Sequence, residues 1–228
     1  MSIKIDTRGD VTWLTIDDGK ANALSTQLVA DLGEALTQLA GKTKALVIAG
    51  RPGRFCAGYD LKVMMSGKEA ASALTAAGCR VMAQLYTFPA PVVVACTGHA
   101  MAGGALLLLC GDVRVGVEGP FKIGLNEVQI GIPLPQFGID LVTARLDPRQ
   151  VARATMGAHT FDPASAAVAG FLDFTASPDT LMDTAQAEAE RLAQLATGPY
   201  ALTKRGLRQR AADKMVAEVD ANLAVLLG

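Results

Sequence analysis

A glycine-containing stretch in the middle of the chain has the residue types needed to bind a developing negative charge. Val92 to Cys96 is a β-branched apolar run that predicts a buried strand, and Ala105 to Cys110 predicts a buried helix. Gly103 and Gly104 lie between them, where small residues let another molecule approach the backbone. A helix that begins near Gly103 leaves N–H groups unpaired, and these can bind an anion or an oxyanion. A tight turn between packed elements is the alternative interpretation.

A single carboxylate, Glu127, lies in a segment that is otherwise mostly apolar. Its apolar neighbours are Ile123, Leu125, Val128, Ile130 and Ile132. An acid that faces an apolar pocket has its pKa raised by desolvation, which suits proton transfer near neutral pH. Glu127 is therefore a candidate acid–base residue, and an exposed loop acid is the alternative interpretation.

The surrounding pattern predicts elements that could bring these groups together. Strands followed by helices fill the first two thirds and helices alone the last third, which favours an α/β fold with a helical C-terminal part. Ligands of parallel sheets bind at the carboxyl ends of strands. If strands 44–49 and 92–96 are neighbours, Tyr59 and Gly103 can present N–H groups to one point. Further strands are predicted at 3–6, 11–17, 113–117 and 171–174. Helices are predicted at 25–40, 68–88, 136–145, 148–156, 178–197 and 199–226, and one more begins at residue 162. The helix at 68–88 is expected to be interrupted near Gly78.

Composition excludes several classes of function. The 228 residues include 21 Lys and Arg against 22 Asp and Glu, which gives no electrostatic sign of nucleic-acid binding. The four cysteines form no Cys-x-x-Cys pair and only two histidines accompany them, so we expect buried free thiols and no metal site. The N-terminus has no apolar signal core and no apolar run is long enough to span a bilayer, so the sequence predicts a cytoplasmic protein without a membrane partner.

Four motifs in register give the sequence a resemblance to a known family. They are Asn22-Ala23-Leu24, then Phe55-Cys56-Ala57-Gly58-Tyr59-Asp60-Leu61, then Thr97 to Gly104 continuing through Asp112, then Ile123 to Ile132. Together they resemble the crotonase superfamily, the enoyl-CoA hydratases and isomerases. The fourth motif is similar to the corresponding segment of the mitochondrial Δ3,Δ2-enoyl-CoA isomerases.

The resemblance implies a spiral of ββα repeats with a helical C-terminal region that trimerises. We accordingly expect residues 1–195 to form the spiral core with the acyl-CoA site, residues 196–228 to form the C-terminal helical region, and the chain to assemble as a homotrimer or a dimer of trimers. It also implies an acyl-CoA thioester substrate whose carbonyl lies in an oxyanion hole formed by the N–H groups of Tyr59 and Gly103. Glu127 then stands at a catalytic position.

The resemblance further implies that the coenzyme A part of the substrate lies along two loops. The residues expected to bind it are Lys20, Ala21, Ala23, Ala57, Asp60, Leu61 and Lys62. Lys20 and Lys62 are candidates to meet its phosphates, with solvated surface charges as the alternative. No cofactor beyond the coenzyme A portion of the substrate is expected.

One departure from the family pattern bears on the reaction. Hydratases of this family use two glutamates, and the first would fall at Leu106. The sequence therefore favours an enoyl-CoA isomerase in which Glu127 alone shifts a double bond by moving a proton. A hydratase, or another acyl-CoA lyase or hydrolase, is the alternative, for which Asp60 or Asp140 could supply a second acid. A non-catalytic acyl-CoA-binding protein is a further alternative.

Overall fold

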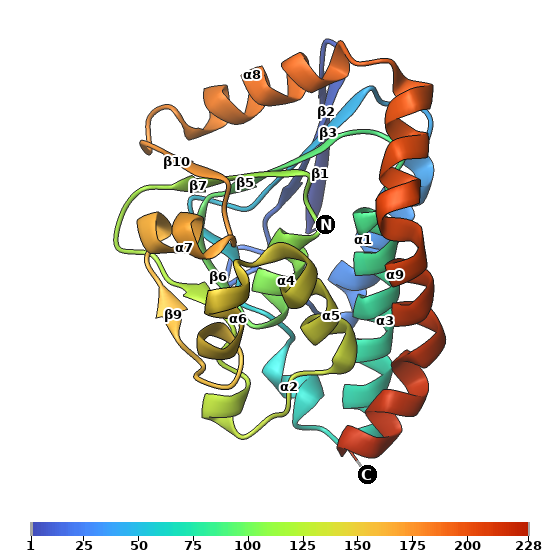
Figure 1. Ribbon diagram of the computed structural model, residues 1–228, viewed down its shortest axis with the longest axis vertical. Helices are drawn as coiled ribbons and strands as arrows, with labels where there is room; N and C mark the ends of the chain where they lie inside the picture. The colour runs from blue at the N-terminus through green and yellow to red at the C-terminus, as the bar shows by residue number, and fades with distance from the viewer. Residues whose placement is uncertain (1, 228) are drawn as a thin grey trace.

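A six-stranded sheet forms the central layer of the molecule, whose residues 2–227 are described by a computed structural model (Figure 1). The strand order is β1–β2–β3–β5–β7–β10, with β1 antiparallel to β2 and the other pairs parallel. The bounds are β1 (Ile3–Arg8), β2 (Val11–Ile16), β3 (Ala45–Ala49), β5 (Val92–Cys96), β7 (Val113–Val117) and β10 (Phe174–Ala176). The strands at 44–49 and 92–96 are direct neighbours, as β3 and β5, so the condition for bringing Tyr59 and Gly103 together is met.

Helices surround this sheet and account for most of the C-terminal third. They are α1 (Thr26–Leu39), α2 (Leu61–Met64), α3 (Lys68–Tyr86), α4 (Gly103–Leu109), the 3₁₀ turn η1 (Val128–Ile130), α5 (Gln136–Arg145), α6 (Pro148–Ala154), α7 (Pro163–Ala169), α8 (Leu181–Ala193) and α9 (Thr197–Leu227). Within residues 2–227, none of these helices is both long enough and apolar enough to cross a membrane.

The central strands are apolar throughout because both faces of the sheet are covered. Successive side chains of a strand point to opposite faces. In β3, Leu46 and Ile48 join the core shared with α1 and α3, whereas Val47 joins a second core that includes residues of α8. Figure 1 shows α8 spanning one side of the sheet, away from the other helices. A strand buried on both faces needs a continuous apolar run, and these runs made β3 and β5 recognisable in the sequence.

A second, smaller sheet was not predicted from the sequence. Its order is β4–β6–β8–β9, with bounds β4 (Gly53–Cys56), β6 (Gly98–Met101), β8 (Ile123–Gly124) and β9 (Thr160–Phe161). These strands have two to four residues and several contain glycine, so they show no alternating pattern. Here the backbones approach closely, since a Cβ on Gly98 would overlap the backbone of Gly53.

Two predicted elements are wrong in detail. The helix at 68–88 is not interrupted near Gly78, because α3 is continuous from Lys68 to Tyr86. Gly78 instead makes room for another part of the chain, since a Cβ there would overlap the Tyr59 hydroxyl group. The strand predicted at 171–174 lies at Phe174–Ala176, and Phe171 and Leu172 are buried in the core before it begins.

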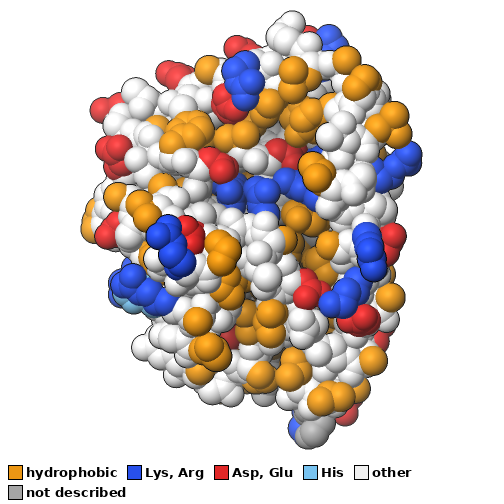
Figure 2. Space-filling model, viewed as in Figure 1, with side chains coloured by type: hydrophobic (Ala, Val, Ile, Leu, Met, Phe, Trp, Pro, Cys, Tyr) orange, Lys and Arg blue, Asp and Glu red, His pale blue; other side chains and the backbone are white. Residues whose placement is uncertain are grey.

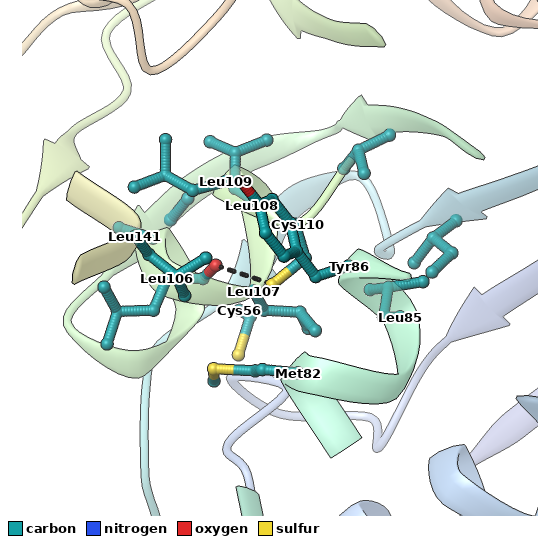
Figure 3. Packing of buried hydrophobic residues seen from close by; sticks show 14 of the residues in the cluster. Cys56, Met82, Leu85, Tyr86, Leu106, Leu107, Leu108, Leu109, Cys110 and Leu141 are labelled. Carbon is teal, nitrogen blue, oxygen red and sulfur yellow. Dashed lines mark hydrogen bonds between the residues drawn. The ribbon is translucent and has the colours of Figure 1, made fainter. Parts of the chain in front are cut away.

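The helix after Gly103 is confirmed and lies at the centre of the larger core. All seven residues of α4 are buried. Its leucines pack against Met82 and Leu85 of α3 and Leu141 of α5 (Figure 3). The Cys110 thiol donates to the Leu106 carbonyl oxygen at 3.3 Å. The position of α4 is therefore fixed by packing on all sides.

A buried charge cluster holds α9 against the body of the molecule. The Asp112 carboxylate accepts from Lys204 Nζ at 2.6 Å and lies 2.7 Å from Arg208 Nη1, and all three side chains are at most 10% exposed. Asp112 also accepts from the Val92 N–H at the start of β5. Arg208 donates to the Tyr86 carbonyl oxygen at the end of α3. Removing any one of these side chains would leave a buried charge unpaired, which is strongly destabilising, so the cluster holds α9 in place. Figure 1 shows α9 lying alongside α3.

Candidate active site

A cavity of about 190 Å³ lies where the ends of α9, α2 and α4 meet the segment around Glu127. Most of its lining is apolar, which suits a hydrocarbon occupant. The lining residues are Ala57, Tyr59, Leu61, Met64, Thr75, Ala102, Leu106, Asn126, Glu127, Ile130, Ile132, Pro133, Pro135, Leu223 and Leu226. Tyr59 and Glu127, predicted independently as site residues, therefore face the same space.

Two stretches of backbone that are far apart in the sequence meet beside this cavity. Leu24 donates to the Gly58 carbonyl oxygen at 2.8 Å and accepts from the Asp60 N–H at 3.2 Å. The Ala57 N–H donates to the Ala21 carbonyl oxygen at 3.1 Å. The two loops expected to bind coenzyme A, at residues 21–24 and 57–62, are therefore side by side.

The backbone at Tyr59 and the backbone at Gly103 also meet, as expected if β3 and β5 are neighbours. Gly58 has φ of +93°, and a Cβ placed on it would lie 3.3 Å from the Gly103 nitrogen. A Cβ on Gly103 would lie 2.9 Å from the Tyr59 ring. Neither the Tyr59 N–H nor the Gly103 N–H has a hydrogen-bond acceptor among residues 2–227. Two free donors thus lie close together at the edge of the cavity, and only glycines permit this approach.

The partly buried Tyr59 side chain packs beside this backbone and is not an acid or base itself. It is enclosed between Gly78 of α3 and Gly103 of α4, and its hydroxyl group donates to the Thr75 carbonyl oxygen at 3.4 Å. Burial raises the pKa of the Tyr59 hydroxyl group well above its usual value, so the group stays protonated.

The four cysteine thiols also stay protonated near neutral pH, since burial raises the pKa of each thiol to about 12. They are free and buried, as predicted.

Glu127 is the acidic residue of the cavity. Its side chain lies just before η1, is 9% exposed, and has an oxygen, Oε2, that is buried without a hydrogen-bond partner. Burial raises the pKa of Glu127 to about 7, against a backbone hydrogen bond that lowers it. A carboxyl group with such a pKa can accept and return a proton near neutral pH. The expectation that Glu127 is a buried acid rather than an exposed loop acid is confirmed.

The two other acids considered for catalysis do not line the cavity. Asp60 accepts from the Lys62 N–H at 2.9 Å and caps α2. Asp140 accepts from Gln136 and pairs with Lys214 at 3.3 Å. Leu106, where a second glutamate was expected in a hydratase, does line it. Within the described part of the chain, Glu127 is therefore the only acid in the cavity wall.

The residues expected to bind coenzyme A divide into three groups. Ala57 and Leu61 line the cavity, and Ala21, Ala23 and Asp60 lie in the paired loops beside it. The Lys20 and Lys62 side chains are exposed.

Several cavity residues were not identified from the sequence. Asn126 precedes the acid and has its own buried, unpartnered oxygen, Oδ1. Leu223 and Leu226 reach the cavity from the last turns of α9. The apolar period of α9 showed that one face is buried, but no sequence pattern shows which cavity that face closes. Gly78, in the middle of a helix, was the available sign that another group packs closely against α3.

Comparison with known proteins agrees with this geometry. The sequence matches the family profile described as enoyl-CoA hydratase/isomerase over residues 6–227. The chain therefore belongs to the enoyl-CoA hydratase/isomerase family.

Particular relatives differ in their named activities. The crystal structure of an enoyl-CoA hydratase/isomerase family protein from Pseudomonas syringae is 38% identical, covers 99% of this chain and 98% of that one, and has a TM-score of 0.95. The human mitochondrial delta3-delta2-enoyl-CoA isomerase is 26% identical, with a TM-score of 0.94 over 100% of this chain and 91% of that one. Carnitinyl-CoA dehydratase of Proteus mirabilis is 29% identical over 198 residues, which are 86% of this chain and 76% of the relative. The predicted crotonase fold is confirmed, and the family contains more than one reaction.

Proposed function

We propose that this protein is an enoyl-CoA isomerase that shifts a double bond with one carboxylate. The observation that carries this proposal is that the cavity wall contains Glu127 together with an apolar Leu106, the residue at which the family resemblance places the second acid of a hydratase. A double-bond shift needs one group that takes a proton and returns it, whereas hydration by the family route uses two acids. A buried carboxyl group with a pKa of about 7 suits this role.

In the proposed reaction the thioester carbonyl oxygen accepts hydrogen bonds from the Tyr59 and Gly103 N–H groups. Glu127 removes a proton from C2 of a 3-enoyl thioester. The C2–H electron pair forms a C1=C2 bond and the carbonyl π electrons move to the oxygen, which gives a dienolate in which C3=C4 is conjugated with C1=C2. The two N–H donors stabilise its negative oxygen, with an effect of about 10²–10³ in rate per donor in other enzymes. Glu127 then returns the proton to C4, which gives the 2-enoyl thioester.

Substrate binding is proposed to use the two paired loops beside the cavity. Ala21, Ala23, Ala57, Asp60 and Leu61 lie in these loops, which are joined by backbone hydrogen bonds. The exposed Lys20 and Lys62 ammonium groups are proposed to meet the phosphates of coenzyme A. No cofactor beyond the coenzyme A portion of the substrate is part of the proposal.

We also propose that the chain forms a homotrimer or a dimer of trimers. Large apolar side chains are exposed on one chain, including Leu202 and Leu207 of α9, Met156 after α6 and Val168 of α7. Figure 2 shows such side chains gathered in several places on one face. Contiguous exposed apolar surface often marks an interface. A monomer by light scattering at micromolar concentration would contradict this proposal.

Enoyl-CoA hydration is the second candidate, and one observation favours it. The Asn126 side chain places an amide next to Glu127 in the cavity wall, where it could orient a water molecule. The purified protein should therefore be tested with 3-enoyl-CoA and 2-enoyl-CoA thioesters, with isomerisation and hydration followed separately. Isomerisation of 3-enoyl-CoA with little hydration is expected. Hydration as the faster reaction would replace the isomerase proposal, and binding without turnover would indicate a non-catalytic acyl-CoA-binding protein.

A further inference from the structure

The part of the cavity wall that α9 contributes is the end of a row of apolar side chains on one face of that helix. Ala212, Met215, Val219 and Leu223 are at most 3% exposed and follow each other at intervals of three or four residues. Such spacing places them on one face of the helix. Leu226 continues this face, lines the cavity and is partly exposed. Leu226 is thus the last described side chain on this apolar face of α9, and it borders the cavity rather than the hydrophobic core.

The last part of α9 contacts the rest of the molecule at several points before Leu223. The Cys79 thiol of α3 donates to the Met215 carbonyl oxygen at 3.6 Å, and Arg80 pairs with Asp220 at 2.6 Å. The Asn222 side-chain oxygen accepts from the Gln136 N–H at 3.0 Å. That bond caps α5 directly after Pro135, another residue of the cavity wall. The helix end is therefore tied both to α3 and to the start of α5.

The cavity enclosed by this wall is small. Its volume of about 190 Å³ is below the range of about 300–1,000 Å³ that is usual for pockets holding drug-sized ligands. Because the helix is held in place, the side chains on its inner face decide how much of an acyl chain fits.

We propose that Leu226 sets the acyl-chain length of the substrate, and that the preferred substrates are enoyl thioesters with short linear acyl chains. This inference rests on the proposed function, because it assigns the apolar cavity to the acyl chain. Leu226 occupies space that a longer chain would need. Leu223 also lines the cavity but belongs to the hydrophobic core as well, so a substitution there would also disturb core packing.

The chain offers a matched control for testing Leu226. Val225 is the preceding residue on the same helix, is 82% exposed and does not line the cavity. Leu226→Ala, Leu226→Trp and Val225→Ala should be compared with the parent on 3-hexenoyl-, 3-octenoyl-, 3-decenoyl- and 3-dodecenoyl-CoA. Thermal unfolding of each variant verifies that it is folded.

The parent is expected to prefer 3-hexenoyl-CoA to 3-dodecenoyl-CoA in kcat/KM. Leu226→Ala should raise kcat/KM for the longer thioesters by roughly fourfold for each methylene group newly buried. Leu226→Trp should reduce it for all but the shortest, and Val225→Ala should leave the profile unchanged. If the parent isomerises these substrates but Leu226→Ala and Val225→Ala give the same profile, Leu226 does not set chain length. If the parent isomerises none of them, the proposed function itself is wrong.

Discussion

Two sides of the cavity, one that carries free backbone N–H groups and one that carries Glu127, are built in different ways. The donor side, formed by Gly58-Tyr59 and Ala102-Gly103, presents backbone N–H groups held by the bridge to Leu24 and by the buried helix α4. The acid side, formed by residues 126–135, consists of a 3₁₀ turn and irregular backbone with one carboxylate. Val128 and Ile130 on this side are about half exposed.

This difference indicates which changes each side can tolerate. A backbone donor is present whatever the side chain, so only an added Cβ or a shift of the backbone disturbs it. A carboxylate is lost by changing one atom. Different reactions on this scaffold are therefore expected to arise from side chains such as Leu106 and Glu127, while the donor side stays constant.

The strongest way to test the acid side is Glu127→Gln, which keeps the shape but cannot accept and return the proton. Isomerase activity should fall by about 10²–10⁴ while coenzyme A binding is nearly unchanged. Steady-state kinetics and calorimetric titration with coenzyme A measure the two effects. Glu118→Gln, at an exposed position outside the cavity, is the control and should be fully active. Parental turnover in Glu127→Gln would show that another group moves the proton.

The donor side is tested by Gly103→Ala. The added Cβ would lie 2.9 Å from the Tyr59 ring and 3.3 Å from Leu24, so the two donors must move apart. If the two donors bind the thioester oxygen as proposed, a loss of about 10²–10³ in kcat is expected, as when one oxyanion-hole donor is removed from other enzymes. Gly206→Ala is the matched control, because no atom lies within 4 Å of its Cβ and alanine favours the helix. Equal activity of the two variants would mean that Gly103 is not at the reacting centre.

The pH dependence tests whether Glu127 acts as the base. Its pKa of about 7 predicts that kcat/KM rises about tenfold per pH unit below pH 7 and levels off above it. A profile without an inflection between pH 6 and 8 would contradict the assignment.

The same group links stability to pH. Its pKa is raised from 4.5 in the unfolded chain to about 7 in the folded protein, so between these values the folded state binds more protons. The free energy of unfolding should therefore fall as pH rises through this window, by at most about 3 kcal/mol from Glu127. Denaturant unfolding at pH 5 and pH 8 measures the change. In Glu127→Gln the fall in the free energy of unfolding between pH 5 and pH 8 that is due to Glu127 should disappear. If the variant shows the same fall as the parent, other titrating groups cause it.

The smallest expected change in activity comes from Leu106→Glu, which places a second carboxylate in the wall of the cavity that Glu127 lines. Hydration of 2-enoyl-CoA should rise above the parent's low rate, because the new acid can hold water. Stability should fall by about 1–3 kcal/mol, since a polar group enters an apolar wall. Leu106→Gln separates the loss of packing from the gain of an acid. High hydratase activity in the parent, with no gain in Leu106→Glu, would mean that another residue holds the water.

The features that could be predicted from the sequence are those that leave a side-chain pattern, whereas features formed by close backbone contacts could not be predicted. Continuous apolar runs identified β3 and β5, and their parallel pairing placed Tyr59 and Gly103 together. The apolar neighbours of Glu127 indicated its burial. The contribution of Leu223 and Leu226 could not be predicted, because the periodicity of a helix defines a buried face but not its partner. The second sheet was missed because its short strands form through close backbone contacts rather than through a side-chain pattern.

The attachment of α9 has a consequence for how the protein folds. Lys204 and Asp112 are 92 residues apart in the chain, and Arg80 and Asp220 are 140 residues apart. Contacts between such distant residues form slowly, because closing a long stretch of chain costs conformational entropy before the contact stabilises it. We therefore expect the strands to assemble before α9 docks, and the cavity to acquire its last wall late in folding. An intermediate without that wall would expose the apolar lining of the cavity to solvent.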